Sequence, residues 1–79
     1  MTIKLKVGDK VRCVSTDGSD PGITLGSVYV VTGVEGDKDY SRCGSRIFEN
    51  DFNFVDDDED VRYGKFPFDG FEQWELVTD

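Results

Sequence analysis

Val28-Tyr29-Val30-Val31-Thr32 is the strongest strand signal in this chain of 79 residues, and it decides the fold class. All five residues are β-branched or aromatic, and such side chains favour extended backbone. The run is almost continuously apolar, which predicts a central strand that is buried on both faces. We therefore expect Val28 and Val30 to belong to the core of a β-sheet.

Weaker strand signals lie on both sides of this stretch. Residues 10–15, 52–55 and 61–66 alternate between apolar and polar side chains, and the last two should pair as a hairpin. Helical spacing of apolar residues is missing, because Gly or Pro interrupts most windows. We predict a small five-stranded all-β barrel with strands at residues 10–15, 28–34, 46–55, 61–66 and 74–77. The residues expected to be buried are Val11, Cys13, Val28, Val30, Phe54, Tyr63 and Leu76.

The length of the chain allows a single domain spanning residues 1–79. A domain of this size buries roughly 60–65% of the surface of its unfolded chain, so its core is modest. The first residues are too few and too polar for a signal peptide, and no run approaches the length of a membrane span. These features predict a cytoplasmic protein without a membrane partner.

The two cysteines, Cys13 and Cys43, lack the spacing of a disulfide framework or a zinc site. Cys13 lies in an alternating segment and is expected to be a small buried core residue. Cys43 is flanked by Arg42 and Arg46, and such neighbours lower the pKa of a thiol. An inert cysteine in a loop is the favoured interpretation of Cys43.

Catalytic and metal-binding signatures are weak in this sequence. There is no histidine, which removes the commonest general base and most transition-metal sites. Asp56-x-Asp58-x-Asp60 matches the first three ligands of an EF-hand loop, but Val61 and Pro67 stand where glycine and glutamate are needed. We expect a protein that is not an enzyme and has no cofactor and no metal site. Loose binding of divalent cations to the acidic run is the alternative.

Charge is divided unevenly along the chain. Residues 1–48 carry seven Lys and Arg against six Asp and Glu, whereas residues 49–79 carry two against eleven. Asp56-Asp57-Asp58-Glu59-Asp60 is expected to form a hydrated turn, because such a run of charge cannot be buried. Eight of the ten aromatic residues lie between Phe48 and Trp74. Most of these rings should fill the core, since a small barrel needs them there.

A resemblance to a known group of proteins follows from two segments. Lys6-Val7-Gly8-Asp9-Lys10-Val11-Arg12-Cys13 and Leu25-Gly26-Ser27-Val28-Tyr29-Val30-Val31 resemble the opening of small SH3-like barrel proteins that are common in bacteriophages. The resemblance covers nearly the whole chain and implies a five-stranded SH3-like barrel, in a phage accessory protein of the host cytoplasm. Its motifs concern turns and core positions, so it implies a binding module without naming the partner.

Three phenylalanines in the acidic third suggest a binding surface. Phe66, Phe68 and Phe71 are too closely spaced around Pro67 and Gly70 for all three to face the core. Aromatic anchors beside carboxylates suit a basic protein surface, through cation–π contacts and charge complementarity. One form of such binding is DNA mimicry, in which carboxylates occupy the phosphate-binding site of a host protein. The candidate partner-binding residues are Phe66, Phe68, Asp69, Phe71, Glu72, Asp57, Asp58 and Glu59.

Two other functions remain open from the sequence. The opening also resembles KOW-type segments of ribosomal and transcription proteins, which implies nucleic-acid binding by a basic surface. Direct binding of DNA or RNA is less favoured, because the acidic third would repel phosphate. The second alternative is a structural component of a larger complex, and the oligomeric state is left undetermined. The basic residues that would serve nucleic-acid binding are Lys4, Lys6, Lys10 and Arg12, with Arg42 and Arg46.

Overall fold

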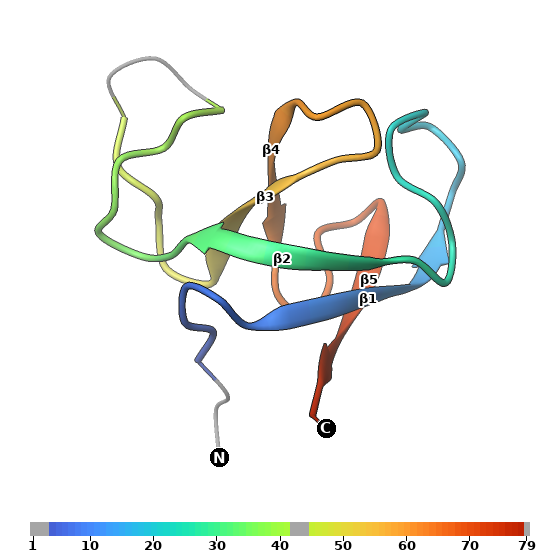
Figure 1. Ribbon diagram of the computed structural model, residues 1–79, viewed down its shortest axis with the longest axis horizontal. Coiled ribbons are helices and arrows are strands. Elements are labelled where there is room, and N and C mark those ends of the chain that lie inside the picture. Colours follow the sequence, from blue (N-terminus) through green and yellow to red (C-terminus); the bar gives the residue numbers. More distant parts are fainter. Residues whose placement is uncertain (1–3, 42–44, 79) are drawn as a thin grey trace.

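The computed structural model of the protein describes residues 4–41 and 45–78 (Figure 1). Five antiparallel strands form one sheet in the order β4-β3-β2-β1-β5. The described residues contain no helix, and hence none long and apolar enough to cross a membrane. The all-β prediction is therefore confirmed. The strands are β1 (Lys10–Thr16), β2 (Val28–Gly33), β3 (Asp51–Val55), β4 (Val61–Lys65) and β5 (Glu72–Val77).

Most predicted strands lie close to the observed ones, but the third predicted strand is longer than the observed one. Residues 46–50 were expected to be extended, yet β3 begins only at Asp51. Arg46 makes an isolated bridge to Lys38, and Asn50 has a φ of 69°, which reverses the chain direction before β3. The predicted pairing of 52–55 with 61–66 is confirmed by the register of Val55 opposite Val61 through Asp51 opposite Lys65.

The prediction that β2 is buried on both faces is wrong. Val28 and Val30 are 43% and 47% exposed, whereas Tyr29 and Val31 between them are buried. A strand buried on both faces needs a second layer over its outer side, and the described chain forms a single sheet with one core cluster. The apolar, β-branched composition of β2 favours extended backbone, but it does not show whether both faces of the strand are covered by other residues.

Some of the other burial predictions are confirmed and others are wrong. Val11, Cys13 and Phe54 are buried as expected, and Cys13 is a free thiol whose pKa is raised chiefly by burial. Leu76 is only half-buried. Tyr63 was predicted to be buried and is 52% exposed. The less exposed positions of β4 are those of Arg62 and Gly64 on either side of it.

The core is a cluster of aromatic rings around Trp74. The Trp74 ring centroid lies 5.1 Å from that of Phe54 and 5.5 Å from that of Phe52, and Tyr29 is 5.3 Å from Phe54. Tilted and edge-on contacts of this kind add about 0.5–1.5 kcal/mol per pair beyond the area they bury. The buried cluster comprises Val11, Cys13, Ile23, Tyr29, Val31, Phe52, Phe54 and Trp74.

Gly64 allows β4 to approach this cluster closely. A Cβ atom at Gly64 would lie 3.0 Å from Phe52 Cζ and 3.2 Å from Trp74 Nε1. The space is filled by two rings that are themselves packed against the core and have little freedom to move. Glycine at this position therefore sets how near β4 can come to Trp74 on β5.

We expect Gly64→Ala to lower the free energy of unfolding by about 1–3 kcal/mol, the usual cost of overpacking a core. Gly33→Ala is the matched comparison. Its Cβ would lie even closer to a neighbour, 2.9 Å from Ile47 Cδ1, but that atom ends a flexible side chain and can rotate away. Urea denaturation of both variants should show the larger loss for Gly64→Ala, and the reverse order would refute this account of the packing.

Candidate functional site

The acidic turn between β3 and β4 is not the uniformly hydrated loop that the sequence predicted, because the Asp56 side chain is fully buried. The backbone N–H groups of Asp58 and Asp60 both donate to Asp56 Oδ1 at 2.9 Å. Arg62 Nε donates to Asp56 Oδ2 at 2.7 Å. Burial alone would raise the pKa of Asp56, but the hydrogen bonds from Asp60, Arg62 and Asp58 lower it. Asp56 is therefore a structural ion that holds the turn closed.

Asp57 links the same turn by hydrogen bonds to the connection between β1 and β2, which lies beside the turn in Figure 1. Its N–H donates to the carbonyl of Gly22 at 2.9 Å, and its carboxylate accepts from Thr24 Oγ1 and from the Tyr29 hydroxyl. Asp58 and Glu59 are exposed at the tip of the turn. All three candidate residues in this turn are exposed, but the Asp57 carboxylate is already hydrogen-bonded to Thr24 and Tyr29.

Arg62 links the turn to a second group of acids. Besides its bond to Asp56, its Nη1 donates to Asp20 Oδ1 at 3.2 Å. The ion pair with Asp56 raises the pKa of Arg62 further. One guanidinium thus bridges the β3–β4 turn and the β1–β2 connection.

Beside Arg62 lies a cavity of about 180 Å³. Its wall combines three carboxylates and one guanidinium with apolar and aromatic surface. Tyr63 and Phe71 are more than half exposed, whereas Ile23 belongs to the core. At this size the cavity is smaller than the 300–1,000 Å³ typical of drug-sized ligands, so it suits one side chain of a partner. The lining residues are Asp20, Ile23, Arg62, Tyr63, Asp69, Phe71 and Glu72.

Glu72 is a buried carboxyl at the start of β5, only 2% exposed. Thr16 Oγ1 donates to Glu72 Oε2 at 3.0 Å. Burial, interaction with the Asp20 carboxyl and the nearby charges of Asp20 and Asp69 raise the pKa of Glu72 to about 7. Near neutral pH the Glu72 carboxyl is therefore protonated for about half of the time.

Asp69 shapes the loop before β5. The N–H groups of Phe71 and Glu72 donate to Asp69 Oδ1 at 2.9 and 2.7 Å, and Trp74 Nε1 donates to Oδ2 at 3.3 Å. These bonds position Phe71 at the mouth of the cavity and tie the loop to the core. Replacing Asp69 would therefore change the loop as well as its charge.

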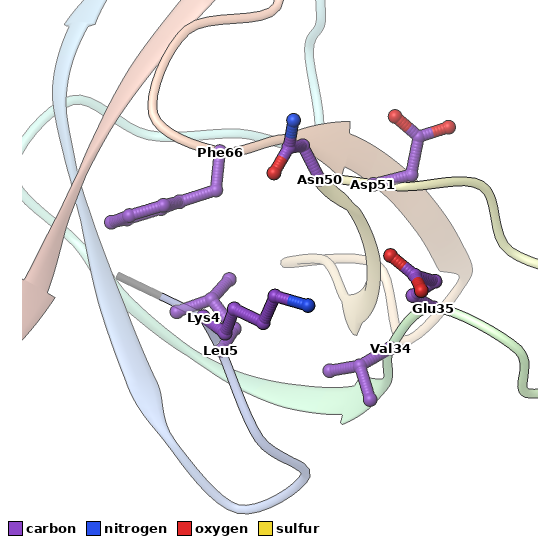
Figure 2. Close-up of a pocket in the computed structure, with 7 residues that line it drawn as sticks. All are labelled: Lys4, Leu5, Val34, Glu35, Asn50, Asp51 and Phe66. Atoms are coloured by element: carbon purple, nitrogen blue, oxygen red, sulfur yellow. The ribbon is translucent and has the colours of Figure 1, made fainter. Parts of the chain in front are cut away.

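The structure places the two remaining candidate phenylalanines elsewhere. Phe68 is 57% exposed and forms an isolated bridge with Gln73, outside the cavity wall. Phe66 is half-buried and lines a different cavity of about 210 Å³. Figure 2 shows Phe66 across this second cavity from Val34 and Glu35. Of the eight candidates, Asp69, Phe71 and Glu72 come together at one cavity.

The basic residues of the nucleic-acid alternative are spread over several segments. Lys4 and Lys6 precede β1, and Lys10 and Arg12 belong to β1. Arg12 Nη1 lies 3.3 Å from Glu75 Oε1, so this guanidinium is already paired with a carboxylate. Arg46 lies in the connection between β2 and β3, and Arg42 and Cys43 lie outside the described residues.

Four lining residues of the acidic cavity were not found from the sequence. Asp20 and Ile23 belong to a segment that composition marks only as a loop. Arg62 and Tyr63 were assigned to a strand, and their part in the cavity depends on where β4 packs. One signal was available, since Arg62 is the first basic residue after five consecutive acids and an ion pair there is expected.

Neither metal ligation nor known relatives identify the site. Among residues 4–41 and 45–78, no group of three or more His, Cys, Asp or Glu side chains is arranged to hold a metal ion. No protein-family model, curated protein or solved structure with which the chain was compared matches it. The function must therefore be inferred from the geometry of the cavity.

Proposed function

We propose that this protein is a binding module, without catalytic activity, whose cavity beside Arg62 receives a lysine or arginine side chain of a protein partner. The observation that carries the proposal is the composition of the cavity wall. It brings the rings of Tyr63 and Phe71 together with the carboxylates of Asp20, Asp69 and Glu72. A cation between carboxylates and aromatic rings gains both ion pairing and cation–π attraction.

The charge around the cavity supports a cationic partner. At formal charges, Arg62 offsets one of the three lining carboxylates. Asp58 and Glu59 extend from the turn that Arg62 holds through Asp56, and add negative potential near the same side of the molecule. A field of this sign speeds the encounter with a basic surface and repels nucleic acid.

We propose further that the sheet curves into an SH3-like barrel. Strand β2 pairs with β1 at one end and with β3 at the other, so it belongs to two groups of strands. The closeness of Gly64 on edge strand β4 to Trp74 on edge strand β5 supports the same arrangement. In such a barrel the cavity lies between β4 and the loop that leads into β5.

The test uses a synthetic peptide of alternating arginine and serine, acetylated and amidated at its ends, with citrulline replacing arginine in its control. We expect the arginine peptide to bind, the citrulline peptide not to bind, and affinity to fall as salt rises. Phe71→Ala should weaken binding by about 2- to 30-fold, the range of a cation–π contact of roughly 0.5–2 kcal/mol.

Phe68→Ala is the matched control for Phe71→Ala. The two side chains are 57% and 56% exposed, but only Phe71 lines the cavity. The Phe68 variant should keep the affinity of the parent within about twofold, which isothermal titration calorimetry resolves. Equal losses in both variants, or binding of the citrulline peptide, would contradict the proposed role of the cavity.

A further inference from the structure

The geometry around Glu72 suggests how binding at this cavity is regulated. The carboxyl is buried at the cavity wall, and its Oε2 atom accepts a hydrogen bond from Thr16 Oγ1 at 3.0 Å. The same wall contains two further carboxyl groups, those of Asp20 and Asp69. A buried carboxyl beside other carboxylates favours its protonated form.

The charged groups facing Glu72 come from every neighbouring element. Asp20 lies in the β1–β2 connection, Asp69 in the loop before β5, and Arg62 on β4. The thiol of Cys13 on β1 also interacts electrostatically with Glu72. Arg62 is the one cation lining the cavity, and its Nε is engaged by Asp56. Little positive charge is therefore available inside the protein to stabilise an ionised Glu72.

We propose that Glu72 makes the cavity pH-dependent: it keeps a proton while the cavity is empty and releases it to solvent when a cationic side chain enters. The inference rests on the proposed function and adds its regulation. An entering guanidinium or ammonium supplies the positive charge that the wall lacks. Glu72 can then be ionised, and its charge is balanced by the bound cation. Proton release and cation binding consequently favour each other.

The raised pKa of Glu72, about 7, places this exchange near neutral pH. Well above pH 7 the carboxyl is mostly ionised, so binding needs little proton release and the affinity should become constant. Below pH 7 each bound cation must displace one proton. Affinity should then fall by up to tenfold per pH unit, the slope for one linked proton.

The experiment titrates the acetylated, amidated arginine–serine peptide into the protein between pH 5.5 and pH 8. The peptide itself has no group that titrates in this range. We expect the affinity to fall below pH 7, and calorimetry in two buffers of different ionisation enthalpy to show nearly one proton released per peptide at pH 6. In Glu72→Gln, which retains an oxygen for Thr16 and has no titratable group, affinity should be constant over the whole range.

Asp58→Asn is the control for the general effect of negative charge, because it removes an exposed carboxylate from the tip of the turn. It should shift the affinity at all pH values and leave the pH dependence intact. Binding of the peptide with an affinity independent of pH would overturn the role of Glu72 and leave the proposed function standing. Failure to bind at pH 8 would overturn both.

Discussion

Replacing Asp56 with asparagine is expected to lower the free energy of unfolding by about 3–5 kcal/mol, the range for removing one partner of a buried ion pair. Asparagine retains an oxygen for the N–H groups of Asp58 and Asp60. Its amide nitrogen, however, would face Arg62 Nε, which is also a donor and now lies 2.7 Å from Asp56 Oδ2. The guanidinium would lose its closest counter-ion and remain partly desolvated.

Asp58→Asn and Asp60→Asn are the matched controls, because both side chains are exposed at the same turn. Each should change the free energy of unfolding by less than about 0.5 kcal/mol, as surface substitutions usually do. Chemical denaturation at pH 7 measures all three variants. A loss for Asp56→Asn no larger than for its neighbours would show that the turn is held in another way.

Gly22 offers an independent check of the same contact. A Cβ atom at Gly22 would lie 2.6 Å from Asp56 Oδ2 and 3.3 Å from Arg62 Nη2. Gly22→Ala should therefore displace the carboxylate and destabilise the fold. Most of that loss should disappear when Asp56 is already alanine, because the clash is then gone. Additive losses in the double variant would indicate that Gly22 acts through the backbone instead.

The burial of Asp56 explains why the prediction of a fully hydrated turn was wrong. Five consecutive acids look equivalent along the chain, and no local rule separates the first from the other four. What distinguishes Asp56 is tertiary structure: the hairpin returns Arg62 to its side, and Gly22 from a distant loop leaves room for the pair. Burial of a charge is decided by its partners and by the space around them, and here that space depends on Gly22, which is distant in the sequence.

The strands were predicted more successfully because alternation with a period of two is a local property. It located β1, β4 and β5 within two residues at each end, and it predicted the β3–β4 hairpin. The exposed outer face of β2 was missed, because apolar residues there carry the same signal as core residues. The cavity was missed for a further reason, since Asp20, Arg62 and Glu72 meet only after three separate segments have packed.

Glu72→Gln is expected to change how stability depends on pH. The pKa of the Glu72 carboxyl is raised from an ordinary value of 4.5 to about 7 in the folded protein, chiefly by burial. Folding therefore favours the protonated form. The associated stabilisation is fully present below pH 4.5 and is lost as the pH rises to about 7. At 1.36 kcal/mol per pKa unit, the loss over this window is roughly 3 kcal/mol.

Asp56 acts in a different pH range and with the opposite sign. Its folded pKa lies below the ordinary value of 3.8, so its stabilisation is present at higher pH and is lost only as the pH falls through that lower value. The two effects are therefore separable. Stability of the parent protein should be greatest near pH 4 to 5, and should decline on the acidic side through Asp56 and on the neutral side through Glu72.

The measurement compares urea denaturation of the parent and of Glu72→Gln at several pH values from 4.5 to 7.5. Glutamine resembles the protonated carboxyl, since it is uncharged and can accept from Thr16 Oγ1. Relative to the parent, the variant should gain roughly 3 kcal/mol between pH 4.5 and pH 7, because it cannot lose a proton. Contributions from titrating groups that do not interact with Glu72 cancel in this difference. A difference that stays constant with pH would mean that Glu72 ionises normally in the folded protein, and a carboxyl buried at the cavity wall beside Asp20 would then need a compensating charge.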